Sequence, residues 1–475
     1  MTRYLSLLAI GLFALPLAAQ NTDLEALGGL TFNFRNPGAR SLAMGGAFLG
    51  LADDATAAEA NPAGLTILRV PEVSLEVRNS RTDTVMNASG DFPDLSRDIF
   101  FTHSDAAEVS FASVVLPADR WAVAAYYHQP LKIESEINMA WEFNVLNQAV
   151  ARDLPFVFIP RGNPVGSGLP VSRQQCQDMQ FEDLGSCSGF QQTPFYSLVE
   201  MKQETFGVAG AVELGRLSLG AGARYQTFSQ AALTVRYDDF LTPVEALIQA
   251  TELDEEGNAK EENDTTFTAG FKYAFTDSFS VGGVYKQGAE FPTAVFQAVS
   301  FGGEFEEEAF DTTFHVPDTA GLGFAWRPLP ALTLLGDAVF IRYSNLTDDF
   351  RSAYGEIQIL DQPYEIEDST EYHFGAEYFI ASRIPVAIRA GWWREPGHAL
   401  EYVGPLTCTD EQIDEADRVL CSANRVRSAT IFPGSEDEDH YTFGIGLSWP
   451  NFSIDAAYDT SDSFKVGSLS AVVRF

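Results

Sequence analysis

The stretch Tyr441-Thr-Phe-Gly-Ile-Gly-Leu-Ser-Trp449 has a large apolar residue at every odd position and Thr, Gly or Ser at every even position. Successive side chains of a β-strand point to opposite faces, so this pattern gives a strand one apolar face and one small or polar face. The same alternation recurs at 217–226, 267–275, 372–380 and 452–459. These segments predict strands that separate two different media.

A soluble antiparallel sandwich also has alternating strands, but four features favour a transmembrane β-barrel. The polar faces carry mainly Gly and Ser, which suit a lumen, and short connections alternate with long ones. The chain also ends on an alternating strand that closes with Phe475, which resembles the signal read by the outer-membrane barrel assembly machinery. Aromatic residues stand at strand ends, where a membrane barrel has its interfacial girdles: Trp121, Tyr127, Trp326, Trp392 and Trp449.

The alternation predicts 14 strands, an even number as in bacterial single-chain barrels. They are 72–79, 108–116, 120–135, 197–214, 217–236, 265–275, 279–298, 313–327, 332–345, 370–381, 385–395, 439–449, 451–459 and 464–475. The long loops 136–196, 237–264, 346–369 and 396–438 should be extracellular, and the short turns periplasmic. The sequence therefore predicts an all-β fold, a transmembrane antiparallel β-barrel formed by residues 72–475.

The composition excludes several classes of function. The 475 residues include 66 Asp and Glu against 30 Lys and Arg, and a net charge of −36 argues against nucleic-acid binding, which needs a basic surface. Only 4 Cys and 6 His make a His- or Cys-built metal centre improbable. No Walker loop, zinc motif or Gly-x-Ser-x-Gly occurs. We therefore expect no cofactor, no metal site, no catalytic residues and no enzymatic activity.

Two segments precede the predicted barrel. In residues 1–20, Arg3 precedes an apolar run that is too short to span a membrane as a helix, which predicts a secretory signal peptide. Its cleavage point stays open between positions 18 and 20. Residues 21–71 do not alternate and are rich in Gly and Ala, so we expect a compact hatch inside the barrel. A flexible periplasmic tether is the alternative, although it would carry more polar residues.

The hatch segment resembles a known family. The stretch 38–64 contains a Gly-Ala-rich run, then Ala-Asp-Asp-Ala and Asn-Pro-Ala, and is similar to the N-terminal hatch of the long-chain fatty-acid transporter (FadL) family. Residues 315–328 and 332–334 resemble its eighth and ninth strands. The superfamily includes carriers of fatty acids, carriers of aromatic hydrocarbons and proteins that act in secretion. The residues that carry the hatch motif are Gly45, Gly46, Asp53, Asp54, Asn61, Pro62 and Ala63.

The resemblance implies passive diffusion through the barrel. Ligand would collect among the outer loops, enter the upper barrel and leave sideways through a gap at a kink in the third strand. Pro130 lies in that strand and lacks an N–H, so it is disfavoured within a paired ladder. We expect Tyr126 and His128 to face the lumen there and Tyr127 to face lipid. The alternative is that Pro130 only marks the end of the strand.

The 136–196 loop is much longer than a hairpin needs, and such loops are commonly functional. Phe143, Leu146, Val150 and Leu154 recur in it at near-helical spacing, and the apolar residues of the loop could pack against another loop or line a groove that collects ligand. These residues are Trp141, Phe143, Leu146, Val150, Leu154, Phe156 and Phe158. Four cysteines allow three pairings, and local disulfides within each loop suit an oxidising cell surface: Cys176, Cys187, Cys408 and Cys421.

Together these features predict a channel in the outer membrane of a Gram-negative type of cell. It would passively take up hydrophobic small molecules, such as long-chain fatty acids or similar compounds, by lateral diffusion. The expected partners are a fatty-acid or hydrocarbon ligand, outer-membrane lipid and the barrel assembly machinery. Two alternatives are a secretion-accessory or surface-scaffold barrel of the same superfamily and an outer-membrane phospholipase.

Overall fold

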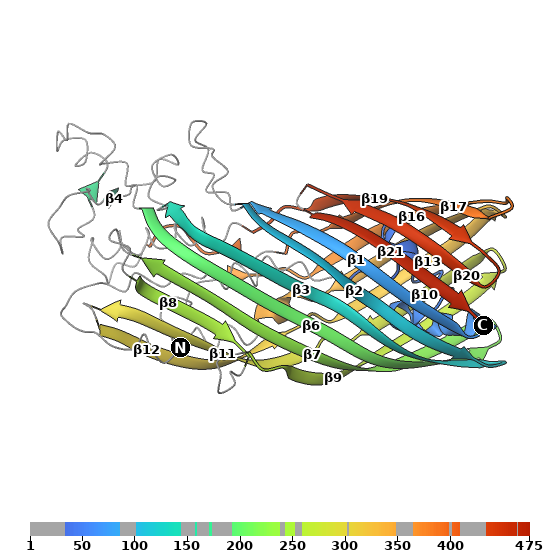
Figure 1. The fold of residues 1–475 in the computed structure, drawn as a ribbon, viewed down its shortest axis with the longest axis horizontal. Helices are drawn as coiled ribbons and strands as arrows, with labels where there is room; N and C mark the ends of the chain where they lie inside the picture. Colours follow the sequence, from blue (N-terminus) through green and yellow to red (C-terminus); the bar gives the residue numbers. More distant parts are fainter. Residues whose placement is uncertain are drawn as a thin grey trace.

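The computed structural model describes residues 34–85, 101–143, 157–158, 171–172, 192–237, 243–251, 259–301, 304–347, 364–398, 401–408, 434–462 and 464–475. Their strands form a closed antiparallel barrel of 14 wall positions, which confirms the fold predicted from the alternation (Figure 1). The predicted signal peptide lies outside the described residues.

Neighbouring wall strands follow one another in chain order. The order is β1 (Glu72–Val85), β2 (Phe101–Pro117), β3 (Trp121–Phe143), β6 (Gln192–Leu214), β7 (Leu217–Tyr237), β9 (Glu262–Thr276), β10 (Phe279–Lys286), β13 (Thr319–Leu329), β14 (Leu332–Ile341), β16 (Ser369–Ile380), β17 (Val386–Glu395), β19 (Glu438–Ser448), β20 (Phe452–Thr460) and β21 (Phe464–Arg474). The pairing of β21 with β1 closes the ring. Every wall strand therefore has two neighbours, and no sheet edge faces lipid at the seam of the two chain ends.

Three wall positions are interrupted, which corrects the predicted strands 279–298 and 313–327 and the predicted loop 237–264. Toward the long loops, β9, β10 and β13 are continued by β8 (Pro243–Ala250), β11 (Glu290–Phe301) and β12 (Glu304–His315). The break between β10 and β11 contains Gly288, where a Cβ would meet the carbonyl oxygen of Val316. The break between β12 and β13 contains Pro317, which has no N–H to give to a ladder.

Smaller elements lie among the long connections. A pair is formed by β4 (Val157–Phe158) and β5 (Val171–Ser172), another by β15 (Tyr364–Glu365) and β18 (Glu401–Tyr402), and η2 (Tyr343–Thr347) follows β14. The predicted loop 136–196 is also shorter than expected, since β3 and β6 extend into it.

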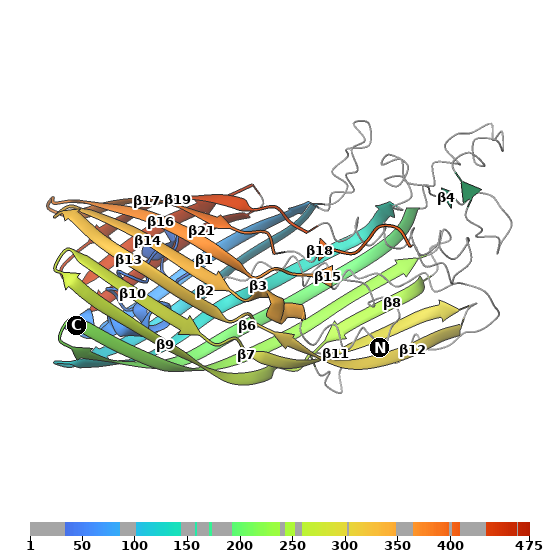
Figure 2. The ribbon, with the colours of Figure 1, turned by 180° about the vertical axis from the view of Figure 1, so that it is seen from behind.

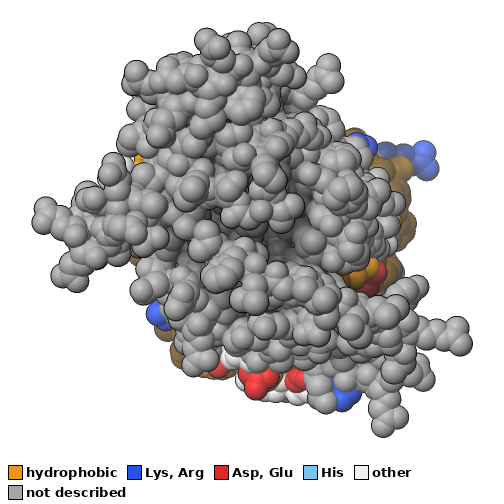
Figure 3. Space-filling model, turned by 90° about the vertical axis from the view of Figure 1, so that its left-hand side faces the viewer, with side chains coloured by type: hydrophobic (Ala, Val, Ile, Leu, Met, Phe, Trp, Pro, Cys, Tyr) orange, Lys and Arg blue, Asp and Glu red, His pale blue; other side chains and the backbone are white. Residues whose placement is uncertain are grey.

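The two ends of the barrel differ. At one end, here called the turn end, short turns join the strands, and Phe475 donates its backbone N–H to the Pro71 carbonyl at 3.1 Å. The opposite end, here called the loop end, carries the long connections (Figures 1 and 2). Acidic side chains gather on the lower rim of the loop end in the view of Figure 3. The start of the first wall strand, β1, and the end of the last, β21, thus both lie on the side of the short turns.

The outer surface of the barrel is apolar, unlike that of a soluble protein. Large apolar side chains are exposed on strands around the whole ring, among them Leu75, Val208, Leu322, Phe374, Ile388, Phe443 and Leu469. Exposed aromatic side chains lie near the turn end, including Trp121, Trp326 and Tyr378, and farther along the strands, including Tyr225, Tyr372, Tyr441 and Tyr458. This apolar band with aromatic borders is the surface that a transmembrane barrel presents to lipid.

The segment 34–71 folds inside the turn-end half of the barrel, as the plug interpretation predicts (Figure 1). It contains α2 (Ala39–Leu42), α3 (Ala57–Ala60) and η1 (Pro62–Ile67), and nearly all its side chains from 35 to 66 are buried. Asn61 accepts a hydrogen bond from the Ala63 N–H at 3.2 Å and so caps η1. No helix in the described part of the chain is long and apolar enough to cross a membrane.

Candidate functional site

The hatch backbone lies directly against a ring of wall glycines. At each of seven positions a Cβ would come within 3.0 Å of a hatch atom, closer than real Cβ atoms approach other atoms. These glycines are Gly220, Gly270, Gly282, Gly321, Gly375, Gly391 and Gly444, on seven different strands. The glycine face of the alternating strands thus provides space for the hatch, and the small residues of the hatch allow the close fit.

Adding one methyl group to this ring should loosen the hatch. Gly391→Ala would place a Cβ against the backbone N of Gly45, which cannot move independently of the hatch. We expect bilayers containing this variant to show frequent opening events, while heat-modifiable gel mobility of the barrel stays normal. Gly467→Ala is the matched control, because nothing lies within 4 Å of its added Cβ. Equal conductance of the two variants would contradict this account of the ring.

The predicted hatch-motif glycines hold the first half of the hatch to the wall. Gly45 and Gly46 have positive φ values of 68° and 79°, which glycine adopts without strain. The Gly45 N–H donates to Thr442 Oγ1 at 2.9 Å, and the Gly45 carbonyl oxygen lies 2.7 Å from His373 Nδ1. Next in the chain, the N–H groups of Phe48 and Leu49 donate to Asp337 Oδ2 at 2.6 and 2.9 Å.

The other predicted motif residues also build the hatch. Asp53 pairs with Arg40 at 2.6 Å and with Arg327 of the wall at 3.3 Å. Asp54 accepts hydrogen bonds from Thr56, and burial raises its pKa although Arg40 opposes this rise. The Asn61 amide donates to the carbonyl oxygens of Leu49 and Phe271, both at 3.1 Å. Pro62 and Ala63 follow it in η1.

A second set of ion pairs, which sequence reasoning missed, joins the hatch to the β16–β21 side of the wall. Arg40 pairs with Glu377, which also pairs with Arg389. Arg35 pairs with Asp459 at 2.7 Å and lies over the ring of Trp393. In the two hatch–wall pairs the partners lie 337 and 424 residues apart in sequence and carry no local motif, so only the closed barrel brings them together.

On the opposite side the β2–β3 ladder ends early. It runs from Pro117↔Ala122 to Phe111↔His128 and does not continue between residues 101–110 and 129–143 in the part of the chain that the structure describes. Beyond this point β2 follows β1 and β3 follows β6, so the ribbons diverge toward the loop end (Figure 1). The boundary between β2 and β3, here called the seam, is therefore parted in the loop-end half of the barrel.

Each strand has an irregularity where the seam parts. On β2, Ser110 is an extra residue between the pairs Glu76↔Phe111 and Val77↔Val109. On β3, Gln129 and Pro130 lie opposite the single residue Glu204, between the pairs His128↔Thr205 and Leu131↔Gln203. These are β-bulges, which bend the strand that carries the extra residue.

The side chains at the parted seam face as predicted. Tyr126 and His128 are buried toward the lumen, whereas Tyr127 lies on the outer face against Phe206, with ring centroids 5.4 Å apart. The Tyr127 hydroxyl donates to Glu204 Oε1 at 2.7 Å. This bond joins β3 to β6 on the outer face, beside the bulge.

A cavity of about 30 Å³ lies behind this seam, between the hatch and the wall. Its lining includes Glu59 of α3, His128, Gln203, Arg224 and Lys286. Glu59 Oε1 lies 2.8 Å from Lys286 Nζ, and Glu59 Oε2 lies 3.7 Å from Arg224 Nε. Burial raises the pKa of Glu59, but attraction to Lys286 and Arg224 outweighs it and holds that pKa below its ordinary value. The cavity is thus a charged layer within the barrel.

An apolar layer lies next to the charged layer on its loop-end side. Phe228 stacks between Phe314 and Phe291, with ring centroids 4.6 and 5.0 Å apart. Leu131 and Met201 are buried on the neighbouring strands β3 and β6. A molecule that enters from the loop end would therefore meet apolar side chains first and charged side chains second.

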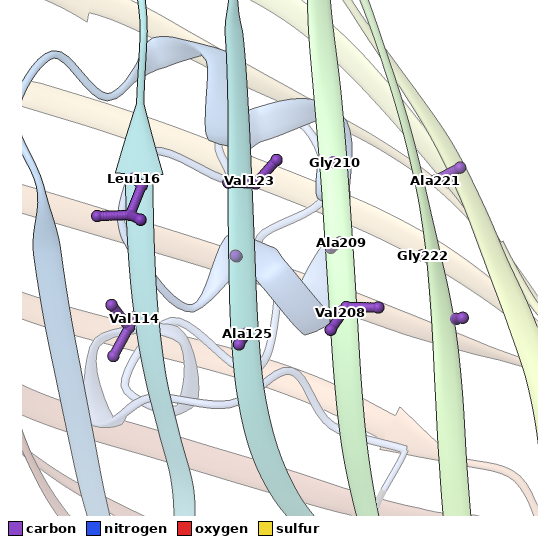
Figure 4. A pocket seen from close by; sticks show the side chains of 11 residues that line it. Val114, Leu116, Val123, Ala125, Val208, Ala209, Gly210, Ala221 and Gly222 are labelled. Carbon is purple, nitrogen blue, oxygen red and sulfur yellow. The ribbon is translucent and has the colours of Figure 1, made fainter.

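On the turn-end side of the parted seam, the outer face of the barrel is hollowed (Figure 4). A groove of about 680 Å³ crosses β2, β3, β6 and β7, with the hatch on the other side of the wall. Val114, Leu116 and Val123 stand along it, whereas small residues such as Gly210 and Ala221 form its floor. The groove is apolar and open to the lipid-facing side.

Several predicted loop residues cannot be placed. Leu146, Val150, Leu154 and Phe156 lie outside the described residues. The backbones of Trp141 and Phe143 belong to the end of β3, and that of Phe158 belongs to β4. Cys408 is disulfide-bonded. Cys176, Cys187 and Cys421 lie outside the described part of the chain, and so does the partner of Cys408.

No family model matches the sequence, and no curated protein is similar to it. Solved structures are similar in fold, at 13 to 14% identity. A Pseudomonas aeruginosa FadL homologue aligns with a TM-score of 0.56 over 94% of this chain and 99% of its own. The CymD monoaromatic hydrocarbon channel gives 0.54 over 94% and 99%, and the Pseudomonas putida toluene transporter TodX gives 0.51 over 93% and 98%. The fold is thus that of FadL-type channels.

Proposed function

We propose that this protein is an outer-membrane channel through which hydrophobic small molecules pass without an energy source. Ligand enters at the loop end, crosses the apolar layer and leaves sideways between β2 and β3. The observation that carries the proposal is the parted β2–β3 seam beside a lumen filled by the hatch. Two similar structures are described as a monoaromatic hydrocarbon channel and a toluene transporter, which supports a hydrophobic cargo.

A sideways exit suits such a cargo physically. Each CH₂ group that leaves water for an apolar environment gains about 0.8 kcal/mol, so a hydrocarbon chain partitions into lipid rather than into a water-filled lumen. A gap in a barrel wall exposes unpaired backbone groups to hydrocarbon, which is costly unless something covers them. The charged layer and the hatch lie directly behind the gap and can cover it.

Uptake by living cells tests the proposal. Expression in a Gram-negative strain without its own hydrophobic channels should raise the initial uptake rates of radiolabelled toluene or oleate several-fold over cells with an empty vector. The uptake of a small hydrophilic sugar is the control and should not change, because the hatch fills the lumen. Unchanged uptake of every hydrophobic substrate would refute the channel and favour a scaffold or secretion role.

A further inference from the structure

The groove on the outer face of the barrel has a floor that crosses the strands diagonally. On β3, Val123 and Ala125 face outward in succession. On β6, Gly210 lies opposite Val123, and Val208 lies opposite Ala125. Each valine therefore faces a small residue, and the floor passes between the two valines from β3 to β6 and on to Ala221 of β7 (Figure 4).

The width of this floor decides which occupant fits. Val123 and Val208 are diagonal neighbours on adjacent strands, and such residues lie about 7–8 Å apart. An α-helix with its side chains is about 10–12 Å across, so a transmembrane helix of a partner cannot enter between them. A single hydrocarbon chain is thin enough to enter. Lipid chains are as apolar as the wall, so a chain gains from the groove through packing contacts on several sides at once.

The turn-end edge of the groove adjoins residues that belong at the level of lipid headgroups. Trp121 is exposed two residues before Val123, on the same face of β3. Tryptophan is enriched where the hydrocarbon core meets the headgroups. Arg120 is exposed next to it in the β2–β3 turn, about 10 Å from Val123 along the chain. A lipid with one chain on the groove floor would therefore have its headgroup at Arg120.

The charges around Arg120 favour a negative headgroup. The Arg120 carbonyl oxygen accepts a hydrogen bond from the Glu213 N–H at 2.8 Å, which brings the turn ends of β3 and β6 together. Arg69, Arg120 and Arg216 lie at or beside these turns against Asp119 and Glu213, in a chain with a net charge of −36. Of the three arginines, only Arg69 forms an ion pair with a described residue, at 3.7 Å from Glu213. Arg120 is thus available to a phosphate group.

We propose that the groove and Arg120 together form a site for one anionic phospholipid, with an acyl chain on the groove floor and the phosphate at Arg120. Short turns of such barrels face the periplasm, so the lipid belongs to the periplasmic leaflet. The inference concerns the lipid-facing surface of the wall and does not depend on the proposed channel function.

The site borders the parted seam. Val114 of β2 pairs with Ala125 of β3, three residues from the last pair of this ladder, Phe111↔His128. An acyl chain on Ala125 therefore lies beside the turn-end edge of the gap. The bound lipid is thus the first hydrocarbon that a molecule leaving through the gap would meet.

Native mass spectrometry of the full-length protein in a neutral detergent tests the site. The protein is titrated with dioleoyl phosphatidylglycerol and with dioleoylglycerol, which has the same chains but no phosphate. We expect the first phosphatidylglycerol to bind about tenfold more tightly than the second. Gly210→Leu should weaken the first binding step of both lipids about tenfold, because its side chain fills the floor and removes roughly ten carbon–carbon contacts. Arg120→Gln should weaken only phosphatidylglycerol, about fivefold.

Gly467→Leu and Arg383→Gln are the matched controls. Gly467 lies on β21, away from the groove, and an added Cβ has space there as it has at Gly210. Arg383 is an exposed arginine of the turn between β16 and β17, on another side of the ring. Both control variants should bind both lipids as wild type does.

Four outcomes would overturn the proposal. The first phosphatidylglycerol binds no more tightly than the second, Gly210→Leu binds both lipids as Gly467→Leu does, or Arg383→Gln weakens phosphatidylglycerol as much as Arg120→Gln. The fourth is a wild-type dimer that Gly210→Leu abolishes, which would show that a second copy of the chain occupies the groove. If Gly210→Leu lacks normal heat-modifiable mobility, Ala125→Leu fills the same floor from β3 and takes its place in the comparison.

Discussion

Deletion of residues 21–65 should convert a closed barrel into an open pore, with a rise in single-channel conductance of about tenfold or more. The hatch is buried across the turn-end half of the lumen and contacts wall glycines on seven strands. Wider barrels leave an aqueous channel unless something fills them, whereas side chains alone fill the smallest barrels. Without the hatch, the glycine faces of these strands would line open water. Planar-bilayer recordings measure the change.

The wall should survive this deletion. The β1–β21 pairing that closes the ring involves no hatch residue, and Arg389 keeps its ion pairs with Glu377 and Asp455 when Arg40 is removed. The Asp337 carboxylate loses two backbone donors but becomes hydrated in the open lumen. Unchanged conductance in a deletion variant with normal heat-modifiable mobility would mean that the hatch does not block the pore.

The fold was predictable because the pattern that determines it is local. A period of two over eight or more residues requires no knowledge of distant partners, so segments such as 441–449 identify themselves as strands. The hatch was predictable for the opposite reason. Residues 38–64 lack this period, and their side chains are too small to form a core of their own.

The wall breaks were missed because apolar alternation continues almost undisturbed across them. The alternation over residues 279–298 predicts one strand although Gly288 lies within this range, whereas the structure ends β10 before Gly288. A Gly or Pro inside a long alternating run is the signal that could have located these breaks. Strand β8 was missed because it lies between a predicted strand and an acidic segment, in a range that was assigned to a loop.

The charged layer could not be derived from the sequence. Glu59, Arg224 and Lys286 lie on the hatch, β7 and β10, and nothing in their local sequence states that they meet. One signal does point to Glu59. A single acid in a small-residue stretch that must fit inside a barrel needs a cationic partner, because an unpaired buried charge is costly.

Pro130, where the sequence predicts a kink in β3, lies at an irregularity of the β3–β6 ladder. The missing N–H of Pro130 does not account for this irregularity alone, because two residues of β3 lie opposite one residue of β6 at this point. After the extra residue the alternation changes phase, so that Leu131 is buried toward the lumen although an uninterrupted strand would turn it to lipid. A phase change of this kind is visible in sequence only once the strand's true length is known.

Deletion of Pro130 should therefore close the exit. Without it, Gln129 would pair with Glu204 while His128 and Leu131 keep their partners Thr205 and Gln203, so the register of the rest of the β3–β6 ladder is unchanged. A straight β3 can continue along β2 beyond Phe111, where unpaired backbone groups would gain ladder hydrogen bonds in an apolar environment. We expect uptake of radiolabelled toluene and oleate to fall about tenfold, equivalent to roughly 1.4 kcal/mol in the barrier.

The control for this deletion is Pro130→Val, which restores a backbone donor but keeps the extra residue and hence the bulge. Its uptake should stay within about twofold of wild type, because the parted seam depends on the count of residues and not on the donor alone. Both variants should reach wild-type abundance and heat-modifiable mobility, since neither alters the wall near the turn end. If Pro130→Val lowers uptake as much as the deletion does, the missing donor is what keeps the seam open. If cells with the deletion still take up both substrates at the wild-type rate, ligand leaves by another route, and the parted seam is a feature of the wall without a role in passage.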